Sequence, residues 1–307
     1  MARFTDRIFR DLCKKHGADI LVTEQIMSDA IIADDKISWA KASFSNSQRP
    51  IGVQIMGSDP VNMGKAAKLV ENRLNPDFID INMGCPVDKI TDKNAGCALL
   101  KNLPLLSKVA STMVSSTDNT PITAKIRIGW DDNSIVALEA CKVLEEAGIT
   151  RVSIHGRTRQ AGYSGVANWE IIEAAAESVA IPIIGNGDIN KDRTLEALRT
   201  TKCKGIMIGR NALGYPWIFN EIKEYFATGE IPQPVSDKER WQTLLEYCRA
   251  LIEFNPQIKD PNNIGWLRPK IITFTRGMKY SKQIRPHLHK VNNIKDLELL
   301  IKQGFTG

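Results

Sequence analysis

The sequence predicts a (β/α)8 barrel with its first strand apparently missing, followed by a small helical domain. Three observations lead to this fold class. Short β-branched runs alternate with amphipathic stretches, polar side chains collect at the ends of the runs, and the alternation stops after Phe226. Repeated β–α units are typical of a parallel sheet covered by helices.

Seven apolar runs read as strands, namely residues 20–24, 51–56, 78–83, 122–128, 151–156, 181–187 and 205–210. Between them lie stretches whose apolar positions repeat at three and four residues, as in helices that pack on a sheet. These stretches are residues 60–74, 103–114, 134–148, 168–179 and 191–201. Asp59, Asn133, Asn168 and Asn190 each precede one of these helices as a plausible N-cap.

Periodicity alone allows either an open doubly wound sheet or an eight-stranded barrel. Polar residues favour the barrel, because they fall at or just past the carboxyl end of successive runs. They are Gln54, Asn82, Cys85, Lys125, Arg127, His155, Asn186, Asp188 and Arg210. In a barrel these ends converge on the face that carries the active site, whereas an open sheet would scatter most of them.

The C-terminal part lacks this alternation. Residues 227–237 form a Gly/Pro-rich linker, and residues 238–254, 265–278, 281–291 and 293–304 read as helices, the first with Asp237 as its cap. We therefore predict two domains, 1–227 and 237–307.

Composition indicates a soluble globular protein, with 43% apolar and 25% charged residues among 307. No stretch approaches the run of about 20 apolar residues that crosses a bilayer, and the charged N-terminus is not a signal peptide. The six cysteines form no CxxC pair, so neither a metal site nor a disulfide framework is indicated. We expect a cytoplasmic monomer without membrane or metal partners.

The positive charge is concentrated at the C-terminal end. From Asp237 onward there are 13 Lys and Arg against 7 Asp and Glu, which accounts for the net charge of +6. Residues 262–293 contain no acid, and Trp266, Phe274 and Tyr280 lie among their cations. Such a stretch is often only a solvated face, but its length favours a polyanionic partner such as nucleic acid.

Five motifs together resemble the tRNA-dihydrouridine synthases. They are "DINMGCPVDKITDKNAGCALLKN", "AKIRIGW", "SIHGRTRQAGYSG", "IGNGDI" and "IMIGRNALGYPWIF", in family order and spacing. The match covers about residues 1–227, with a weaker match in the basic tail. The resemblance implies a bacterial-type FMN enzyme that uses NADPH to reduce particular uridines in tRNA to dihydrouridine.

Cofactor contacts follow from the residues and the resemblance together. A flavin phosphate needs backbone N–H groups and a cation, which the segments after the last two strands supply. The phosphate and ribityl candidates are Asn186, Gly187, Asp188, Gly209 and Arg210. Gln54, Lys125 and His155 are candidate donors to the isoalloxazine ring. The alternative for Lys125 is a structural ion pair.

Family members begin with a strand that ends in a Pro-Met-Ala-type turn under the flavin. Here Met1 and Ala2 match only the end of that turn, and Arg3 stands where glycine is usual. Ala2 is nevertheless a predicted cofactor contact. We expect that the natural protein begins upstream of Met1, because a barrel that lacks a strand exposes unpaired edges.

The resemblance assigns Cys85 the role of general acid. Reduction of the uracil C5–C6 bond takes a hydride at C6 and a proton at C5. A thiol with the ordinary pKa of about 8.5 is mostly protonated at neutral pH and can donate that proton. The alternative is an inert thiol, which is the interpretation we give to Cys97 on its apolar face.

The uridine must be extruded from folded tRNA before it can react. Asn82, Arg127, Arg157 and Tyr163 are the predicted contacts to the base. The basic tail is predicted to bind tRNA phosphates through Arg268, Lys270, Arg276, Lys279 and Arg285. Three alternatives stay open: an FMN barrel that reduces a small molecule, a flavinless RNA-binding remnant, and a phosphate-binding barrel of primary metabolism.

Overall fold

The computed structural model describes residues 4–189, 201–230, 232–254, 264–279 and 281–302. By its internal contacts the chain divides into two compact units. The first comprises Met1–Arg7 and Asp19–Gly209, and the second comprises Ile8–Ala18 and Arg210–Gly307. The functional division into 1–227 and 237–307 stays a prediction.

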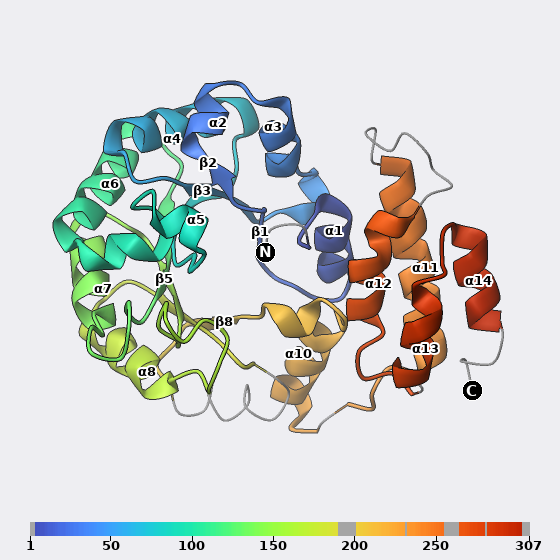
Figure 1. Cartoon of the computed structure of the whole chain (residues 1–307). Coiled ribbons are helices and arrows are strands. Elements are labelled where there is room, and N and C mark those ends of the chain that lie inside the picture. Colours follow the sequence, from blue (N-terminus) through green and yellow to red (C-terminus); the bar gives the residue numbers. More distant parts are fainter. Residues whose placement is uncertain (1–3, 190–200, 231, 255–263, 280, 303–307) are drawn as a thin grey trace. The chain divides into compact units, whose positions relative to one another are not determined.

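The first unit is an open barrel of parallel strands with helices outside it (Figure 1). Its strands pair in the order β1-β3-β4-β5-β6-β7-β8, and β2 also pairs with β3. Among the described residues, β1 and β8 are not paired with each other, as expected for a barrel that lacks one strand. The strands are β1 (Leu21–Val22), β2 (Ile26–Met27), β3 (Ile51–Met56), β4 (Phe78–Met83), β5 (Ile122–Arg127), β6 (Val152–His155), β7 (Ile183–Asn186) and β8 (Gly205–Met207).

Four of the described helices of this unit follow the strands as the periodicity predicts, and three shorter ones, each of fewer than eight residues, lie where the sequence predicts no helix. Together the helices are α2 (Ser28–Ile32), α3 (Lys36–Ala42), α4 (Pro60–Leu74), α5 (Asp88–Thr91), α6 (Leu103–Ser116), α7 (Ala137–Glu146) and α8 (Trp169–Ser178). Asp59 and Asn168 cap α4 and α8, because their side chains accept the backbone N–H of Asn62 and Ile171. Residues 190–200, which hold the predicted cap Asn190 and most of the predicted helix 191–201, lie outside the described part of the chain.

Two predicted details of the first unit are wrong. Asn133 does not cap α7, which begins at Ala137, because Gly129 and Ile135 first form an antiparallel bridge. Residues 20–24 are not one strand, because β1 ends at Val22 and β2 begins at Ile26. The pairing is interrupted where the Thr23 hydroxyl accepts the backbone N–H of Gln54 at 3.1 Å.

The hydrophobic core of this unit lies between the strands and the helices. Ile79, Ile81 and Met83 alternate along β4 and are fully buried in it. Successive strand residues point to opposite faces, so Asp80 and Asn82 point into the barrel. The neighbouring strands follow the same alternation, and the barrel interior is therefore lined by polar side chains.

The second unit is helical. Its helices are α1 (Arg7–Lys15, whose residues from Ile8 onward belong to this unit), α10 (Ile218–Thr228), α11 (Asp237–Phe254), α12 (Arg268–Phe274), α13 (Ser281–Leu288) and α14 (Ile294–Lys302). Trp241 and Phe274 are fully buried in its core. The predicted cap Asp237 is instead the first residue of α11, and the Ser236 hydroxyl accepts the backbone N–H of Glu239 at 3.3 Å. Among the described residues, no helix has both the length and the apolar character needed to span a bilayer.

Candidate active site

The site is built from polar side chains that the sheet register places side by side inside the barrel. Gln54 pairs with Asp80, and Asp80 with Thr123. One row further along the strands, Asn82 pairs with Lys125. The register rows therefore carry the side chains of six strands into one cluster, and the last row comprises Arg127, His155, Asn186 and Met207.

Cys85 lies on a tight turn directly after β4. The Asn82 Oδ1 atom accepts the backbone N–H of Cys85 at 2.9 Å and that of Gly84 at 3.1 Å. Gly84 lets this turn approach β5, since a Cβ atom there would lie 3.2 Å from the carbonyl carbon of Ile126. The turn leaves the Cys85 thiol partly exposed.

A second loop closes on the same turn. The backbone N–H of Cys97 donates to the Cys85 carbonyl oxygen at 3.0 Å. Gly96 has a φ of +61°, and a Cβ atom there would lie 2.7 Å from that oxygen. Burial raises the pKa of the Cys97 thiol to about 12, so this thiol is neutral and inert at physiological pH.

A chain of side-chain amides runs from the Cys85 turn into the barrel. Asn82 Nδ2 donates to Gln54 Oε1 at 2.8 Å and to Gln25 Oε1 at 2.7 Å. Gln54 Nε2 in turn donates to the Asp80 carboxylate at 2.7 Å, and the Thr123 hydroxyl donates to its other oxygen at 2.6 Å. Burial raises the pKa of Asp80, while these two donors and the nearby Lys125 oppose the rise. Both amide hydrogens and both oxygen lone pairs of Asn82 are thus occupied by other groups of the protein.

The two arginines predicted to contact the base are buried and bonded to the protein. Arg127 donates to the carbonyl oxygens of Gly84, Thr158 and Gly162 at 3.2, 2.8 and 2.7 Å. It therefore joins the Cys85 turn to the loop that follows β6. A role of Arg127 in binding the base stays a prediction.

Arg157 forms an ion pair with Asp188, in which Nη2 lies 2.7 Å from Oδ2. Its guanidinium also donates to the carbonyl oxygens of Ser164 and Gly165 at 2.9 and 2.8 Å. The two residues hold the loop after β6 against the end of β7. Their roles as base and cofactor contacts stay predictions.

The loop after β6 presents an aromatic residue to solvent. The Tyr163 side chain is 58% exposed, and its ring centroid lies 6.4 Å from that of His155. The Arg127 guanidinium lies 5.6 Å from the same ring centroid. An ion pair between Arg159 and Asp88 ties this loop to α5, just after Cys85.

Fewer interactions are seen for the residues predicted to contact the flavin phosphate. Asn186 Nδ2 donates to the Met207 carbonyl oxygen at 2.6 Å, which joins the ends of β7 and β8. Gly187 follows with a φ of +127°, and Gly209 follows β8. Arg210 belongs to the second unit, and Ala2 lies outside the described residues.

The predicted tRNA contacts all lie in the second unit. Arg276, Lys279 and Arg285 are exposed, as the sequence leads us to expect of phosphate contacts. Arg268 is partly buried and donates to Asn292 Oδ1 at 2.8 Å, while the ammonium of Lys270 lies 5.9 Å from the Tyr247 ring centroid. Their binding to tRNA stays a prediction.

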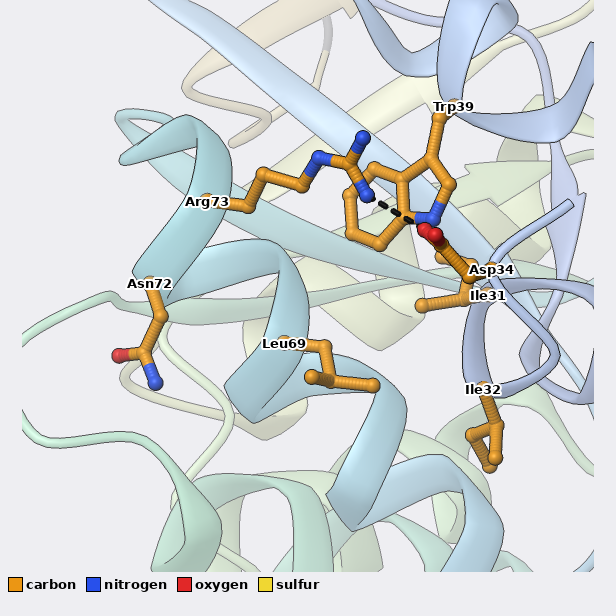
Figure 2. Close-up of a pocket in the computed structure, with 7 residues that line it drawn as sticks. All are labelled: Ile31, Ile32, Asp34, Trp39, Leu69, Asn72 and Arg73. Carbon is orange, nitrogen blue, oxygen red and sulfur yellow. Dashed lines mark hydrogen bonds and ion pairs between the residues drawn. The ribbon is translucent and has the colours of Figure 1, made fainter. Parts of the chain in front are cut away.

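A cavity of about 300 Å³ lies elsewhere in the first unit, between α2, α3 and α4. In Figure 2 the Arg73 guanidinium lies against the Trp39 ring and pairs with Asp34. The cavity is lined by Ile31, Ile32, Asp34, Trp39, Leu69, Asn72 and Arg73. None of these is a predicted site residue, and we do not assign the cavity to the active site.

Comparison with known proteins identifies the family. A family model described as dihydrouridine synthase matches residues 1–303. The chain belongs to the dihydrouridine synthase family. "tRNA-dihydrouridine synthase B" of Shewanella oneidensis is 37% identical over 272 residues, which are 87% of this chain and 84% of that protein. "Probable tRNA-dihydrouridine synthase" of Rickettsia bellii is 37% identical over 313 residues, covering 100% of this chain and 93% of that protein.

The fold comparison agrees with the barrel. The structure of the old yellow enzyme from Trypanosoma cruzi superposes with a TM-score of 0.53 at 9% identity. The match covers 75% of this chain and 84% of that one. At this identity the likeness concerns the fold alone.

Lys125 lies on β5 in the candidate site, next to Asn82 in the register. Among the described residues, its ammonium group makes neither a hydrogen bond nor an ion pair, so the predicted alternative of a structural ion pair finds no partner there. Burial lowers the pKa of Lys125 to about 8, the positive charge of Arg127 adds to this, and Asp80 partly opposes it. A half-buried cation without an ion-pair partner costs folding free energy and suits a site that receives an electron-rich ligand.

Sequence reasoning missed two residues of the site. Asp80 could have been found, because a carboxylate on the same strand face as Asn82 must point into the barrel. Gln25 carried no such signal, since its direction depends on the interruption between β1 and β2. Both join the amide chain that ends at Cys85.

We predict that Lys125→Met stabilises the ligand-free protein at pH 7 by on the order of 2 kcal/mol. The folded-state pKa of about 8 is below the ordinary 10.5, so the unfolded chain binds this proton more tightly. The wild-type protein should therefore gain stability as the pH rises from about 8 to 10.5, and the advantage of the variant should shrink over that window. Urea unfolding at several pH values measures this.

The matched control is Lys108→Met, which replaces an exposed lysine on α6 and should leave stability unchanged at every pH. A Lys125→Met protein that is less stable than the wild type at pH 7, or a difference that does not vary with pH, would contradict the account.

Proposed function

We propose that this protein reduces uridine in tRNA to 5,6-dihydrouridine, with FMN as its flavin, NADPH as the reductant and Cys85 as the general acid. The observation that carries the proposal is that two reactive side chains lie on or directly after adjacent strands. A partly exposed thiol sits on a hydrogen-bonded turn after β4, and the neighbouring strand β5 carries Lys125, whose ammonium group makes neither a hydrogen bond nor an ion pair among the described residues. The family membership and the names of the relatives support this choice of reaction.

The residues present fit a flavin. An isoalloxazine ring gains negative charge on reduction, and the Lys125 ammonium is a cation that makes neither a hydrogen bond nor an ion pair among the described residues. Gln54 keeps one N–H and one lone pair beyond its bonds to Asp80 and Asn82. We propose that these two residues and His155 hold the ring, and that Asn186, Gly187, Asp188, Gly209 and Arg210 hold the phosphate end. When bound and reduced, the flavin supplies the hydride that adds to C6 of uracil, and NADPH restores its reduced form.

Cys85 supplies the other hydrogen. Its Sγ atom gives a proton to C5 as the C5–C6 π bond is lost, and the thiolate that remains regains a proton from solvent. Asn82 holds the two backbone N–H groups of this turn, so the sulfur is fixed relative to the strand ends. A rigid turn after a barrel strand gives the positional accuracy that proton transfer needs.

The extruded base would meet two exposed side chains at this face. Tyr163 offers a ring for stacking, and Val87 follows the Cys85–Pro86 step with 56% of its side chain exposed. Arg127 and the Arg159–Asp88 pair brace the two loops that carry them. We infer that the slot between these loops admits one pyrimidine.

The second unit would supply affinity for tRNA. Its exposed cations Arg276, Lys279 and Arg285 lie in a stretch without acidic residues. Such contacts fix the position of a nucleic acid but read no sequence.

Purified protein loaded with FMN should form dihydrouridine in unmodified tRNA with NADPH, and mapping the product identifies the uridine. A flavin-loaded protein that consumes NADPH with a small enone but leaves tRNA unchanged would favour the small-molecule alternative.

Cys85→Ala should keep bound FMN and its reduction by NADPH, yet lose about 100-fold or more of the tRNA reduction rate, because the proton donor is gone. Flavin absorbance measures the first property and dihydrouridine formation the second. Cys203→Ala, which removes another partly exposed thiol, is the control and should retain full activity. Normal tRNA reduction by Cys85→Ala would refute the general-acid assignment.

The double variant Arg276→Gln/Arg285→Gln should weaken tRNA binding without changing FMN content. Each lost phosphate contact reduces the slope of log affinity against log salt by about 1. Filter binding at several salt concentrations measures the slope, with Lys108→Gln on α6 as an exposed-charge control. An unchanged slope would show that these cations do not contact tRNA.

A further inference from the structure

Gln25 lies in the site because the pairing with β3 is irregular between β1 and β2. Leu21 and Val22 pair with Ile51 and Gly52, whereas Ile26 and Met27 pair with Ile55 and Met56. Three residues therefore separate Val22 from Ile26 where two separate their partners, which is the pattern of a β-bulge. Bulges next to active sites commonly re-aim a side chain.

The extra residue determines the direction of Gln25. Ile26 belongs to the core between strands and helices, so the residue before it points to the opposite face, into the barrel. There Gln25 Oε1 accepts from Asn82 Nδ2 at 2.7 Å, and Gln25 Nε2 faces the Cys85 sulfur at 4.0 Å. Gln25 is therefore the side chain whose amide donor is aimed at the thiol.

Both ends of the amide chain impose this orientation. At one end, the backbone N–H groups of Gly84 and Cys85 are donors only, so Asn82 must present its oxygen to them. Asn82 then offers N–H to Gln54 and Gln25, and each of these must present its oxygen. At the other end, the Asp80 carboxylate accepts the Gln54 N–H, which agrees with this polarity.

We propose that Gln25 is a catalytic residue that donates a hydrogen bond to the Cys85 sulfur and stabilises the thiolate left after proton transfer. The catalytic part of this inference rests on the proposed function. A thiolate is a much stronger acceptor than a thiol, so a contact that is long in the resting state strengthens as negative charge develops. Asp80 and Asn82 act through Gln25 and the turn, and are positioning residues.

The test compares Gln25→Leu with Gln25→Glu. Leucine removes the donor, whereas glutamate keeps the acceptor for Asn82 but places negative charge beside the sulfur. Iodoacetamide reacts with the thiolate, so the alkylation rate of the Cys85 peptide at fixed pH, followed by mass spectrometry, reports how well the thiolate is stabilised. We expect about tenfold slower alkylation in Gln25→Leu and a still larger decrease in Gln25→Glu.

The order of the two variants separates the proposal from a packing role. If Gln25 only supports Asn82, Gln25→Leu should be the slower of the two, because it alone removes the acceptor of the Asn82 amide. Gln48→Leu is the control, because it removes another buried amide of this unit, one that donates to the Arg7 carbonyl oxygen at 2.9 Å, and should leave Cys85 alkylation unchanged. Wild-type alkylation rates in both Gln25 variants would overturn the proposal.

The rate of tRNA reduction gives a second and separate readout. It should fall about tenfold in Gln25→Leu, which corresponds to about 1.4 kcal/mol in the barrier. If the wild-type protein itself does not reduce tRNA, the proposed function fails while the alkylation result still decides whether Gln25 bonds the sulfur. If tRNA reduction is normal in a Gln25→Leu protein whose alkylation is slowed, the hydrogen bond exists but the catalytic role is refuted.

Discussion

The site depends on one constraint, the fixed polarity of the amide chain between Asp80 and the Cys85 turn. A buried carboxylate accepts at one end and two backbone N–H groups donate at the other. Between them, Gln54 and Asn82 each have one allowed orientation. A reversed amide would place two donors or two acceptors against each other, which is costly in a buried site. The position of the Cys85 turn therefore follows from side chains on the two adjacent strands β3 and β4.

In the barrel, one face of the strands stabilises the fold and the opposite face carries the candidate site. Apolar residues such as Ile79 and Ile81 on the outer face of the strands form the core with the helices. The inner face carries Asp80, Asn82 and Lys125, which contribute little hydrophobic stabilisation and some cost. Lys125 shows this most clearly, because its half-buried charge makes neither a hydrogen bond nor an ion pair among the described residues. Active sites commonly contain groups that lower the stability of the fold but are needed for reactivity.

The alternation of apolar and polar residues along the strands and the residue types in the turns explain which features of the fold and the site could be predicted from the sequence. The period-2 pattern of β4 predicts both its buried face and the inward direction of Asn82, and the Gly-Cys-Pro step predicts the turn that carries the thiol. The same reasoning could not find Gln25, because its direction depends on the bulge before β2, where the Thr23 hydroxyl accepts the backbone N–H of Gln54. Nor could it show that Arg157 is bonded to Asp188, since that contact joins residues from two loops.

Neutron diffraction from deuterium-exchanged crystals would test the central claim most directly, because it locates the hydrogen atoms of the amides. The account predicts deuterium on Gln54 Nε2 facing Asp80, on Asn82 Nδ2 facing both glutamines, and on Gln25 Nε2 facing the Cys85 sulfur. A Gln25 oxygen turned toward the sulfur, or a deuterium on Asp80 directed at Gln54, would contradict it.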